Sequence, residues 1–398
     1  MAKIDELFKL MVDQGASDLH LVAGAAPYLR LSGEMEKLDM PVLTSEVAQD
    51  MIFEILTDKQ KKEFITNWEL DFAYTKEPLG RFRVNVFMQR KGIGVVCRII
   101  PTKIKTAEEL GLPSSLLDLI NCHKGLICVT GPTGSGKSTT LAALIHHINV
   151  TQQAHILTIE DPIEFVHPSL KSLVNQREVH NHSKSFANAL KAALREDPDV
   201  ILVGEMRDLE TISLAISAAE TGHLVFGTLH TNNAHKTVDR IIDVFPGDRQ
   251  AQIRVQLSES LRGVISQSLL PKAGGKGRVA IQEVLYCNKA IANLIREGKT
   301  FQIPSAMQTG KNQGMVTFES AVEHLIARGQ ITREVGNEFL GKAPDVAEKA
   351  AATAAAGSSP VMGGSAGVPT SPPTGIIMQP QTPTSALGNL ANRFKKTS

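Results

Sequence analysis

Hydrophobic and polar positions in the first hundred residues predict a small mixed α/β domain. Ile4–Gln14 has apolar residues spaced as on one face of a helix, which predicts a short amphipathic helix. Period-two alternation or flanking turn residues predict four strands: Leu19–Val22, Tyr28–Leu31, Arg81–Gln89 and Gly94–Ile100. The pattern assigns residues 1–100 to this domain and residues 101–113, which begin and end with proline, to a linker.

From residue 114 the pattern changes to short apolar strands separated by helical stretches. Four such strands are predicted: Gly125–Thr130, Ile156–Ile159, Val200–Val203 and Leu224–Thr228. Helices are predicted over Leu116–Asn121 and Lys137–Ile148. Because strands without a polar face must be buried on both sides, this alternation predicts a parallel sheet covered by helices on both faces. We expect this α/β core to span residues 114–270.

The next part of the chain is predicted to be helical. Pro246–Leu270 has apolar residues at helical spacing throughout, so the sequence predicts a long helix there. Further helices are predicted over Lys289–Gly298 and Phe318–Arg328. We expect residues 271–342 to form a helical subdomain.

Composition changes after residue 342. No charged residue occurs from Ala350 to Asn392, and Ala, Gly, Pro, Ser and Thr dominate. Such a segment buries too little apolar surface to offset the loss of chain entropy, so residues 343–398 are predicted to be disordered. Residues 392–398 are either a short basic peptide for a partner or lipid surface, or a solvated terminus.

Charge and cysteine content narrow the class of protein. The 398 residues include 42 Lys and Arg against 41 Asp and Glu, without the basic excess usual in nucleic-acid binders. The N-terminus lacks an apolar signal segment, and no apolar run reaches the roughly 18–20 residues that span a bilayer. The four cysteines form no C-x-x-C pair, which favours buried thiols in a reducing compartment over a zinc ribbon. We therefore expect a protein that is cytoplasmic or peripheral to a membrane.

A glycine-rich motif follows the strand predicted at Gly125–Thr130. Gly131–Ser138 reads GPTGSGKS and fits G-x-x-x-x-G-K-[ST]. Its glycines let backbone N–H groups face phosphate oxygens, and the following helix presents its positive end to them. Lys137 is expected to reach the β- and γ-phosphates, and Ser138 to bind Mg²⁺. The residues predicted to hold ATP are Gly131, Pro132, Thr133, Gly134, Ser135, Gly136, Lys137, Ser138 and Thr139.

Acidic residues follow two other predicted strands. Glu205 ends the strand at Val200–Val203, where P-loop enzymes carry the acid that polarises the attacking water, so Glu205 is the candidate general base. Glu160 and Glu164 follow the strand at Ile156–Ile159, and ligands bind at this edge of a parallel sheet. We expect Glu160 and Glu164 to position Mg²⁺ or water; the alternative is a solvated acidic loop.

One histidine and three arginines are further candidates. His230 follows the strand at Leu224–Thr228, where it either registers the γ-phosphate or is structural. Nothing near the P-loop supplies an arginine, so we expect a cation from another domain or subunit to stabilise the transferred phosphoryl group. Arg81, Arg83 and Arg98 lie on the last strands of the first domain; the alternative for each is a surface or ion-paired arginine.

Four motifs occur in an order that resembles the secretion ATPase superfamily. GPTGSGKSTT, LTIEDPIEF, DPDVILVGEMRD and TGHLVFGTLHTNNA are similar to its Walker A, Asp box, Walker B and His box. The segments SDLHL, GRFRVN and NLIREGKTFQIPSAMQTG resemble the type IV pilus retraction ATPases, the PilT family. The resemblance covers residues 1–342 and leaves out the tail.

The resemblance implies an N-terminal PAS-like domain and a RecA-like P-loop ATPase domain with a C-terminal helical subdomain, assembled as a homo-hexamer. It assigns Glu164 to the Asp box, Glu205 to Walker B and His230 to the His box. It also implies that Arg83 and Arg98, and less directly Arg81, close over the γ-phosphate of ATP.

The implied function is an ATP-hydrolysing, Mg²⁺-dependent motor that powers type IV pilus retraction and twitching motility. It would work in the cytoplasm, at the inner membrane. Implied partners are the inner-membrane pilus platform protein, the pilus base and a possible paralogous retraction ATPase, without nucleic acid.

One position departs from the family pattern. Residues 290–297 read AIANLIRE where the family has AIRNLIRE, so Ala292 replaces an arginine in a motif associated with retraction rather than hydrolysis. The motif also fits a helix with a core-facing side. The start at the PAS-like domain and the missing C-x-x-C favour retraction over a pilus assembly or type II secretion ATPase. An accessory ATP-dependent scaffold and a nucleic-acid translocase are the remaining alternatives.

Overall fold

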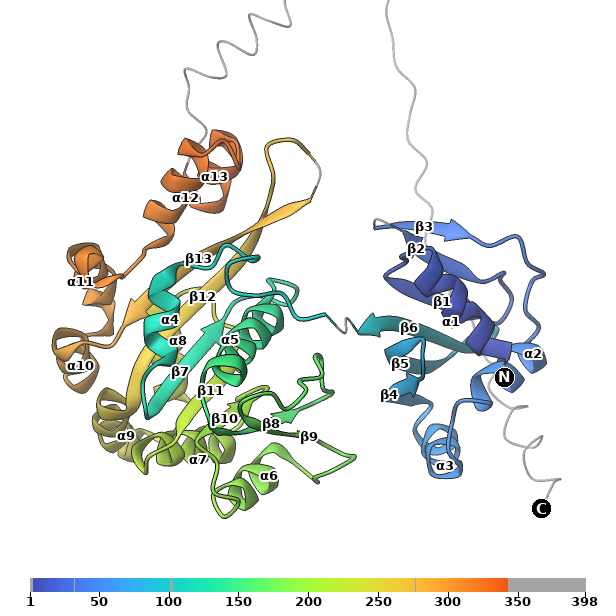
Figure 1. Ribbon diagram of the computed structural model, residues 1–398, viewed down its shortest axis with the longest axis horizontal. Coiled ribbons are helices and arrows are strands. Elements are labelled where there is room, and N and C mark those ends of the chain that lie inside the picture. Colours follow the sequence, from blue (N-terminus) through green and yellow to red (C-terminus); the bar gives the residue numbers. More distant parts are fainter. Residues whose placement is uncertain (1–2, 32, 101–102, 276, 343–398) are drawn as a thin grey trace, which may run out of the picture. The chain divides into compact units, whose positions relative to one another are not determined.

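The computed structural model describes residues 3–31, 33–100, 103–275 and 277–342 (Figure 1). The disorder predicted for residues 343–398, and both interpretations of residues 392–398, lie outside the described residues. Within them, two separate sheets account for all the named strands.

The first domain is built on an antiparallel sheet of six strands in the order β3-β2-β1-β6-β5-β4. Its strands are β1 (Asp18–Val22), β2 (Tyr28–Leu31), β3 (Glu34–Lys37), β4 (Glu69–Lys76), β5 (Gly80–Gln89) and β6 (Gly92–Ile100). Its helices are α1 (Lys3–Asp13), α2 (Ser45–Phe53) and α3 (Asp58–Asn67). The amphipathic helix and the four strands predicted here are confirmed. Ile4, Phe8 and Met11 of α1 are fully buried in the core of this domain.

The second sheet has seven strands in the order β13-β12-β7-β11-β10-β8-β9. Its strands are β7 (Gly125–Thr130), β8 (His155–Glu160), β9 (Leu173–Glu178), β10 (Val200–Val203), β11 (Leu224–Leu229), β12 (Leu261–Pro271) and β13 (Arg278–Tyr286). All neighbours pair in parallel except β12 and β13, which are antiparallel. The predicted parallel sheet is therefore confirmed, with an added antiparallel edge strand.

Helices cover both faces of this sheet, as the apolar strands predicted. The covering helices are α4 (Ser114–Ile120), α5 (Lys137–Thr151), α6 (Phe186–Ala193), α7 (Leu209–Glu220), α8 (Ala234–Asp243) and α9 (Gly247–Ser260). Alternate residues of β7 join different cores: Leu126 packs in a cluster with α7 and α8, whereas Ile127 packs in a cluster with α4 and α5. This arrangement leaves the carboxyl ends of the strands as the open edge where a ligand can bind.

The long helix predicted over Pro246–Leu270 is wrong in its second half. Helix α9 ends at Ser260, and the chain continues directly into β12. Leu261 and Ile265 fit the helical period, but both are fully buried in the sheet, where pairing with β7 decides the structure. At Gly263 an added Cβ would lie 2.8 Å from the carbonyl oxygen of Leu285, so only glycine allows this close strand packing.

The predicted boundary at residue 270 therefore falls inside the β12–β13 hairpin, and the helical part begins only after Tyr286. It contains α10 (Lys289–Arg296), α11 (Ile303–Thr309), α12 (Phe318–Ala327), α13 (Arg333–Phe339) and two short 3₁₀ turns, Thr300–Gln302 and Lys311–Gln313. In α10, Ile291 and Ile295 are fully buried in the core, and Leu294 packs against it.

The composition led to expectations about the cysteines and about membrane-spanning helices. All four cysteines are free thiols; Cys97 and Cys128 are buried, and Cys122 and Cys287 are partly buried. No helix in the described parts of the chain is both long enough and apolar enough to span a bilayer.

Candidate nucleotide site

The glycine-rich loop joins the fully buried strand β7 to the N-terminus of α5. Gly131, Gly134 and Gly136 all have positive φ, at 143°, 79° and 86°. A Cβ on Gly131 would come within 2.1 Å of the carbonyl oxygen of Gln267, so this glycine is required by both conformation and packing. The N-cap residue of α5 is Gly136, which has no side chain to cap the first turn. Its N–H groups and its positive dipole end are therefore presented at the loop, an arrangement suited to phosphate.

Two further features of the loop fit a bound polyphosphate. The hydroxyl oxygen of Ser135 is buried and has no hydrogen-bond partner among the described residues. Lys137 extends its ammonium group over the loop, 2.8 Å from the carbonyl oxygen of Gly131. Burial lowers the pKa of Lys137, while the carboxylates of Glu205 and Glu164 oppose that shift. A desolvated cation near backbone N–H groups is complementary to phosphate oxygens.

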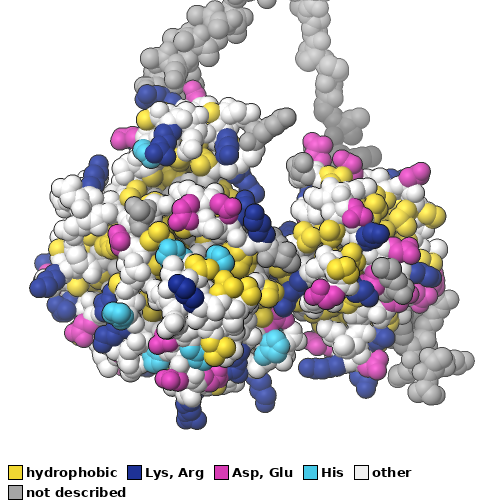
Figure 2. Space-filling model, viewed as in Figure 1, with side chains coloured by type: hydrophobic (Ala, Val, Ile, Leu, Met, Phe, Trp, Pro, Cys, Tyr) yellow, Lys and Arg dark blue, Asp and Glu magenta, His cyan; other side chains and the backbone are white. Residues whose placement is uncertain are grey.

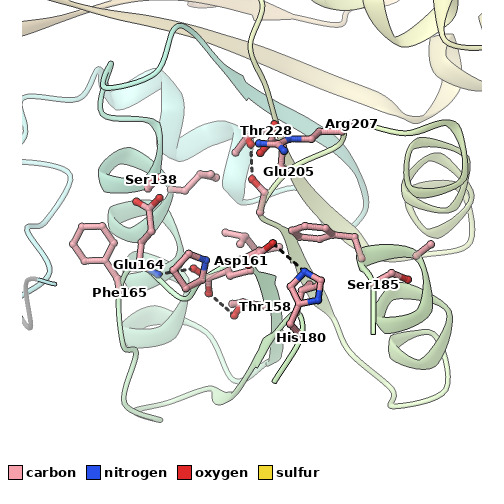
Figure 3. A pocket seen from close by; sticks show the side chains of 18 of the residues that line it. Ser138, Thr158, Asp161, Glu164, Phe165, His180, Ser185, Glu205, Arg207 and Thr228 are labelled. Atoms are coloured by element: carbon pink, nitrogen blue, oxygen red, sulfur yellow. Dashed lines mark hydrogen bonds and ion pairs between the residues drawn. The ribbon is translucent and has the colours of Figure 1, made fainter. Parts of the chain in front are cut away.

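A cavity of about 450 Å³ lies beside the loop, at the carboxyl ends of β8 and β10. Ser138 of α5, Glu164 and Glu205 all line it, and Figure 3 shows them around this space. The sequence predicted that the acids following these strands would meet the phosphate loop, because parallel strands end at the same edge. The cavity therefore brings Ser138, Glu164 and Glu205 together, although Ser138 and Glu205 are 67 residues apart in the sequence.

Two side chains, from His230 and Arg207, contact Glu205 just after β10. The Nε2 atom of His230 lies 3.0 Å from its Oε1 atom. The Nε atom of Arg207 contacts the same oxygen, and this hydrogen bond raises the pKa of Arg207. Glu205 is only partly buried, so its carboxylate remains reachable from the cavity that it lines. Arg207 was not predicted, although its position two residues after Glu205 was a local signal.

The two predicted acids of the Asp box have different surroundings. Glu160 is enclosed, and its carboxylate accepts hydrogen bonds from the Thr158 hydroxyl at 2.7 Å and from the backbone N–H of Glu164 at 3.2 Å. The side-chain amide of Gln176 donates to it as well, at 3.2 Å. Burial raises the pKa of Glu160. Glu164 by contrast is exposed at the cavity. Glu160 therefore holds the loop that presents Glu164.

Metal binding by these acids would depend on the nucleotide. In the described residues, no three His, Cys, Asp or Glu side chains are grouped so that they could hold a metal ion by themselves. Ser138 and Glu164 nevertheless face one cavity with oxygen donors, the ligand type that Mg²⁺ takes alongside substrate phosphates. The residue set thus fits Mg²⁺ delivered with ATP, and the metal roles of Ser138, Glu160 and Glu164 stay predictions.

The predicted arginines are all ion-paired. Arg83 of β5 lies opposite Arg98 of β6 in the first sheet, so the two side chains share one face. Each is balanced by a carboxylate: Arg83 Nη2 lies 2.6 Å from Asp71, and Arg98 Nε lies 2.8 Å from Asp18. The hydrogen bond that Arg83 donates to the Asp71 carboxylate raises the pKa of Arg83. These pairs hold two like charges side by side that would otherwise repel each other.

Arg81 and His223 have structural contacts. The Nη2 atom of Arg81 lies 2.5 Å from the buried carboxylate of Glu178 on β9. That carboxylate also accepts from the backbone N–H of Ile163, at 3.1 Å, in the Asp-box loop. The Nδ1 atom of His223, at the start of β11, is 3.0 Å from the carbonyl oxygen of Ala218. Of the two histidines that flank β11, only His230 reaches the acidic cavity residues.

Comparison with known proteins gives consistent matches. The protein family described as "Type II/IV secretion system protein" matches residues 74–337. A Pseudomonas aeruginosa protein named "Type IV pilus retractation ATPase PilT" is 54% identical over 335 residues, covering 84% of this chain and 97% of that protein. A Neisseria gonorrhoeae "Twitching motility protein" is 54% identical over 313 residues, covering 79% of this chain and 84% of that protein.

A solved structure has a fold similar to that of this chain, and nearly the whole of that structure aligns with it. It is described as "Crystal Structure of the Pilus Retraction Motor PilT and Bound ADP" and aligns with a TM-score of 0.80 and 50% sequence identity. The alignment covers 87% of this chain and 99% of that one.

Proposed function

Since this chain belongs to the type II/IV secretion system protein family and, within it, to the type IV pilus retraction ATPases, we propose that it hydrolyses ATP to power pilus retraction and twitching motility. One observation carries the proposal: the phosphate loop with Lys137 and Ser138 adjoins a single cavity that also contains Glu164 and Glu205. ATP hydrolysis requires at least a P-loop that binds the phosphates and an acidic residue that faces it.

Each side chain has a role that follows from its surroundings. Lys137 and the N–H groups at the start of α5 bind and neutralise the phosphates. Ser138 and Glu164 would hold Mg²⁺, which supplies further charge neutralisation at the phosphate oxygens. Glu205 orients the attacking water and accepts its proton, and His230 fixes the orientation of the Glu205 carboxylate. Arg83 and Arg98 stabilise charge on the transferred phosphoryl group after exchanging their carboxylate partners for phosphate.

The assembly and location follow from the same family membership. We expect a homo-hexamer that works in the cytoplasm, at the inner membrane, against the pilus platform protein and the pilus base. A paralogous retraction ATPase is a further expected partner. Nucleic acid is not expected: on the face shown in Figure 2, Lys and Arg are dispersed among Asp and Glu without forming one basic patch.

Ala292 is expected to affect how ATP hydrolysis is coupled to pilus retraction, and not the hydrolysis itself. It is half-buried on α10, beside Ile291 and Ile295 in the core, and it does not line the cavity near Glu205. The arginine that the family carries here is therefore not needed for the chemistry proposed above. The effect of this substitution is expected in retraction force or frequency, with ATP turnover unaffected.

A Glu205→Gln replacement in the chromosomal gene tests the proposal, with surface pili and twitching scored in the same cells. Abundant pili without twitching are expected, because the variant binds ATP but cannot activate water. Bald cells would instead indicate a pilus assembly motor. If neither pili nor twitching changed, a paralogous ATPase would cover for this protein or the motor would act on another filament.

A further inference from the structure

In the sheet, β12 flanks β7 on the side away from β10 and β8, and its Gln267 contacts the P-loop. Gln267 of β12 pairs with Gln282 of β13, and Ser266 pairs with Glu283. All four side chains are at most 9% exposed. Buried polar groups of this kind must be hydrogen-bonded, and their partners show what they position.

Gln267 holds the P-loop through two hydrogen bonds. Its Nε2 atom donates to the carbonyl oxygen of Ser135 at 2.7 Å, and its Oε1 atom accepts from the Thr140 hydroxyl at 2.7 Å. In a trans peptide the carbonyl and the following N–H point in opposite directions. With the Ser135 carbonyl directed at Gln267, the N–H of Gly136 is therefore turned away from β12. Gln267 thus sets the orientation of a loop N–H and ties the first turn of α5 to the sheet.

Glu283 holds the segment that follows His230. Its Oε1 atom accepts from the backbone N–H of Ala234, the first residue of α8, at 2.7 Å. Ala234 is four residues after His230, so this carboxylate fixes one end of the short loop that carries the histidine. This side chain thereby joins that loop to β13.

We propose that the β12–β13 hairpin positions the nucleotide site, with Gln267 orienting the P-loop and Glu283 holding the loop after His230. Both are positioning residues: Glu283 acts through a backbone N–H, and Gln267 acts through a backbone carbonyl and the Thr140 hydroxyl. Because they hold different loops, their loss has different kinetic effects: Gln267 acts on phosphate binding, and Glu283 acts on the residue that orients Glu205. The proposal rests on the ATP hydrolysis proposed above.

The test is steady-state ATPase kinetics of the full-length chain at a temperature well below its melting point. Gln267→Met removes both hydrogen bonds at nearly constant volume and is expected to raise KM for ATP about tenfold, with kcat changed less than about twofold. Glu283→Leu leaves the N–H group of Ala234 without its acceptor. It is expected to lower kcat about tenfold at nearly constant KM.

Two matched variants control for general destabilisation. Glu283→Gln keeps an acceptor for Ala234 and is expected to restore kcat. Gln256→Met makes the same exchange as the Gln267 variant, but on α9, where the amide donates to Glu220 at 3.1 Å, and is expected to leave both constants unchanged. If the Leu variant is insoluble, Glu283→Asp, which shortens the side chain by one methylene, takes its place.

The outcomes separate this inference from the function on which it rests. A wild-type chain without ATP turnover would contradict the proposed function. A wild-type chain that turns over ATP, with the Gln267 and Glu283 variants showing lower melting temperatures but unchanged KM and kcat, would overturn the positioning roles alone.

Discussion

His230 and Glu205 are joined by a 3.0 Å contact between Nε2 and Oε1 across the ends of neighbouring parallel strands. The contact links the strand that ends in the candidate base to the loop that begins α8. A histidine placed here fixes which way the carboxylate faces, and hence where a water can be activated.

Replacing His230 by alanine is therefore expected to lower kcat for ATP about tenfold, less than the roughly 10²–10⁴-fold that a group transferring the proton itself contributes, because His230 acts through Glu205. Affinity for ADP should stay the same, because the contact that His230 makes is with Glu205, which is not one of the groups proposed to bind phosphate. His223→Ala is the control, since the imidazole of that histidine contacts the carbonyl oxygen of Ala218 at the end of α7, away from Glu205. Equal losses of kcat in both variants would argue against a specific role for His230.

Replacing Gly131 by alanine should disrupt the phosphate loop. The added Cβ meets the carbonyl oxygen of Gln267 at 2.1 Å, and φ of 143° is unfavourable for any L side chain. We expect a loss of about 2 kcal/mol or more in unfolding free energy and loss of ADP binding. Gly247→Ala, at an open helix start with ordinary φ, should be neutral or slightly stabilising. Denaturant titration of both variants distinguishes the two outcomes.

Glu283 should make stability depend on pH. Burial raises the pKa of Glu283 from 4.5 to about 7, and the nearby Glu319 adds to the shift. A raised carboxyl pKa means that the folded state binds the proton more tightly than the unfolded state. The stabilisation is complete below about pH 4.5 and is lost as the pH rises through 7, by up to about 3 kcal/mol.

The measurement is the free energy of unfolding of wild type and Glu283→Gln between pH 4.5 and 8. The difference between the two proteins isolates this carboxyl from all other titrating groups. The wild type should lose stability relative to the variant as the pH rises across this window. A constant difference would show that Glu283 titrates normally.

The two arginines opposite each other on β5 and β6 should matter for turnover. Arg83→Ala and Arg98→Ala are each expected to lower kcat by about a hundredfold or more, as loss of a cation that stabilises the transferred phosphoryl group does. Arg30→Ala is the matched control, because Arg30 also pairs with Asp18, at 3.7 Å, but has no proposed catalytic role. Similar kcat values for all three variants would show that Arg83 and Arg98 have no specific role in ATP hydrolysis.

Much of the fold follows from local sequence. The boundaries of β7 and β10 were predicted as the structure has them, because a fully apolar run between polar turns has one stable environment, the centre of a sheet. The P-loop was equally clear, since its glycines, Lys137 and Ser138 are contiguous and their geometry depends mainly on the loop's own backbone. Placing Glu164 and Glu205 near it required only that parallel strands end at one edge.

Other features depended on residues distant in sequence. Leu261–Pro271 is a strand because β7 and β13 offer it hydrogen bonds on both sides, although its apolar spacing also fits a helix. Gln267 lies within that misassigned segment and bonds to Ser135, 132 residues away, so no local pattern marked it. The different roles of Glu160 and Glu164 likewise arise from Thr158 and Gln176, which enclose only Glu160.

Sequence by itself determined the phosphate loop, the strands of the sheet centre and the acids at its edge, because their structure follows from backbone conformation and burial over a few residues. Only the tertiary structure decided which polar side chains hold the loops in place. A hydrogen bond between distant segments depends on how the whole chain packs, and hydrophobic periodicity carries no information about it.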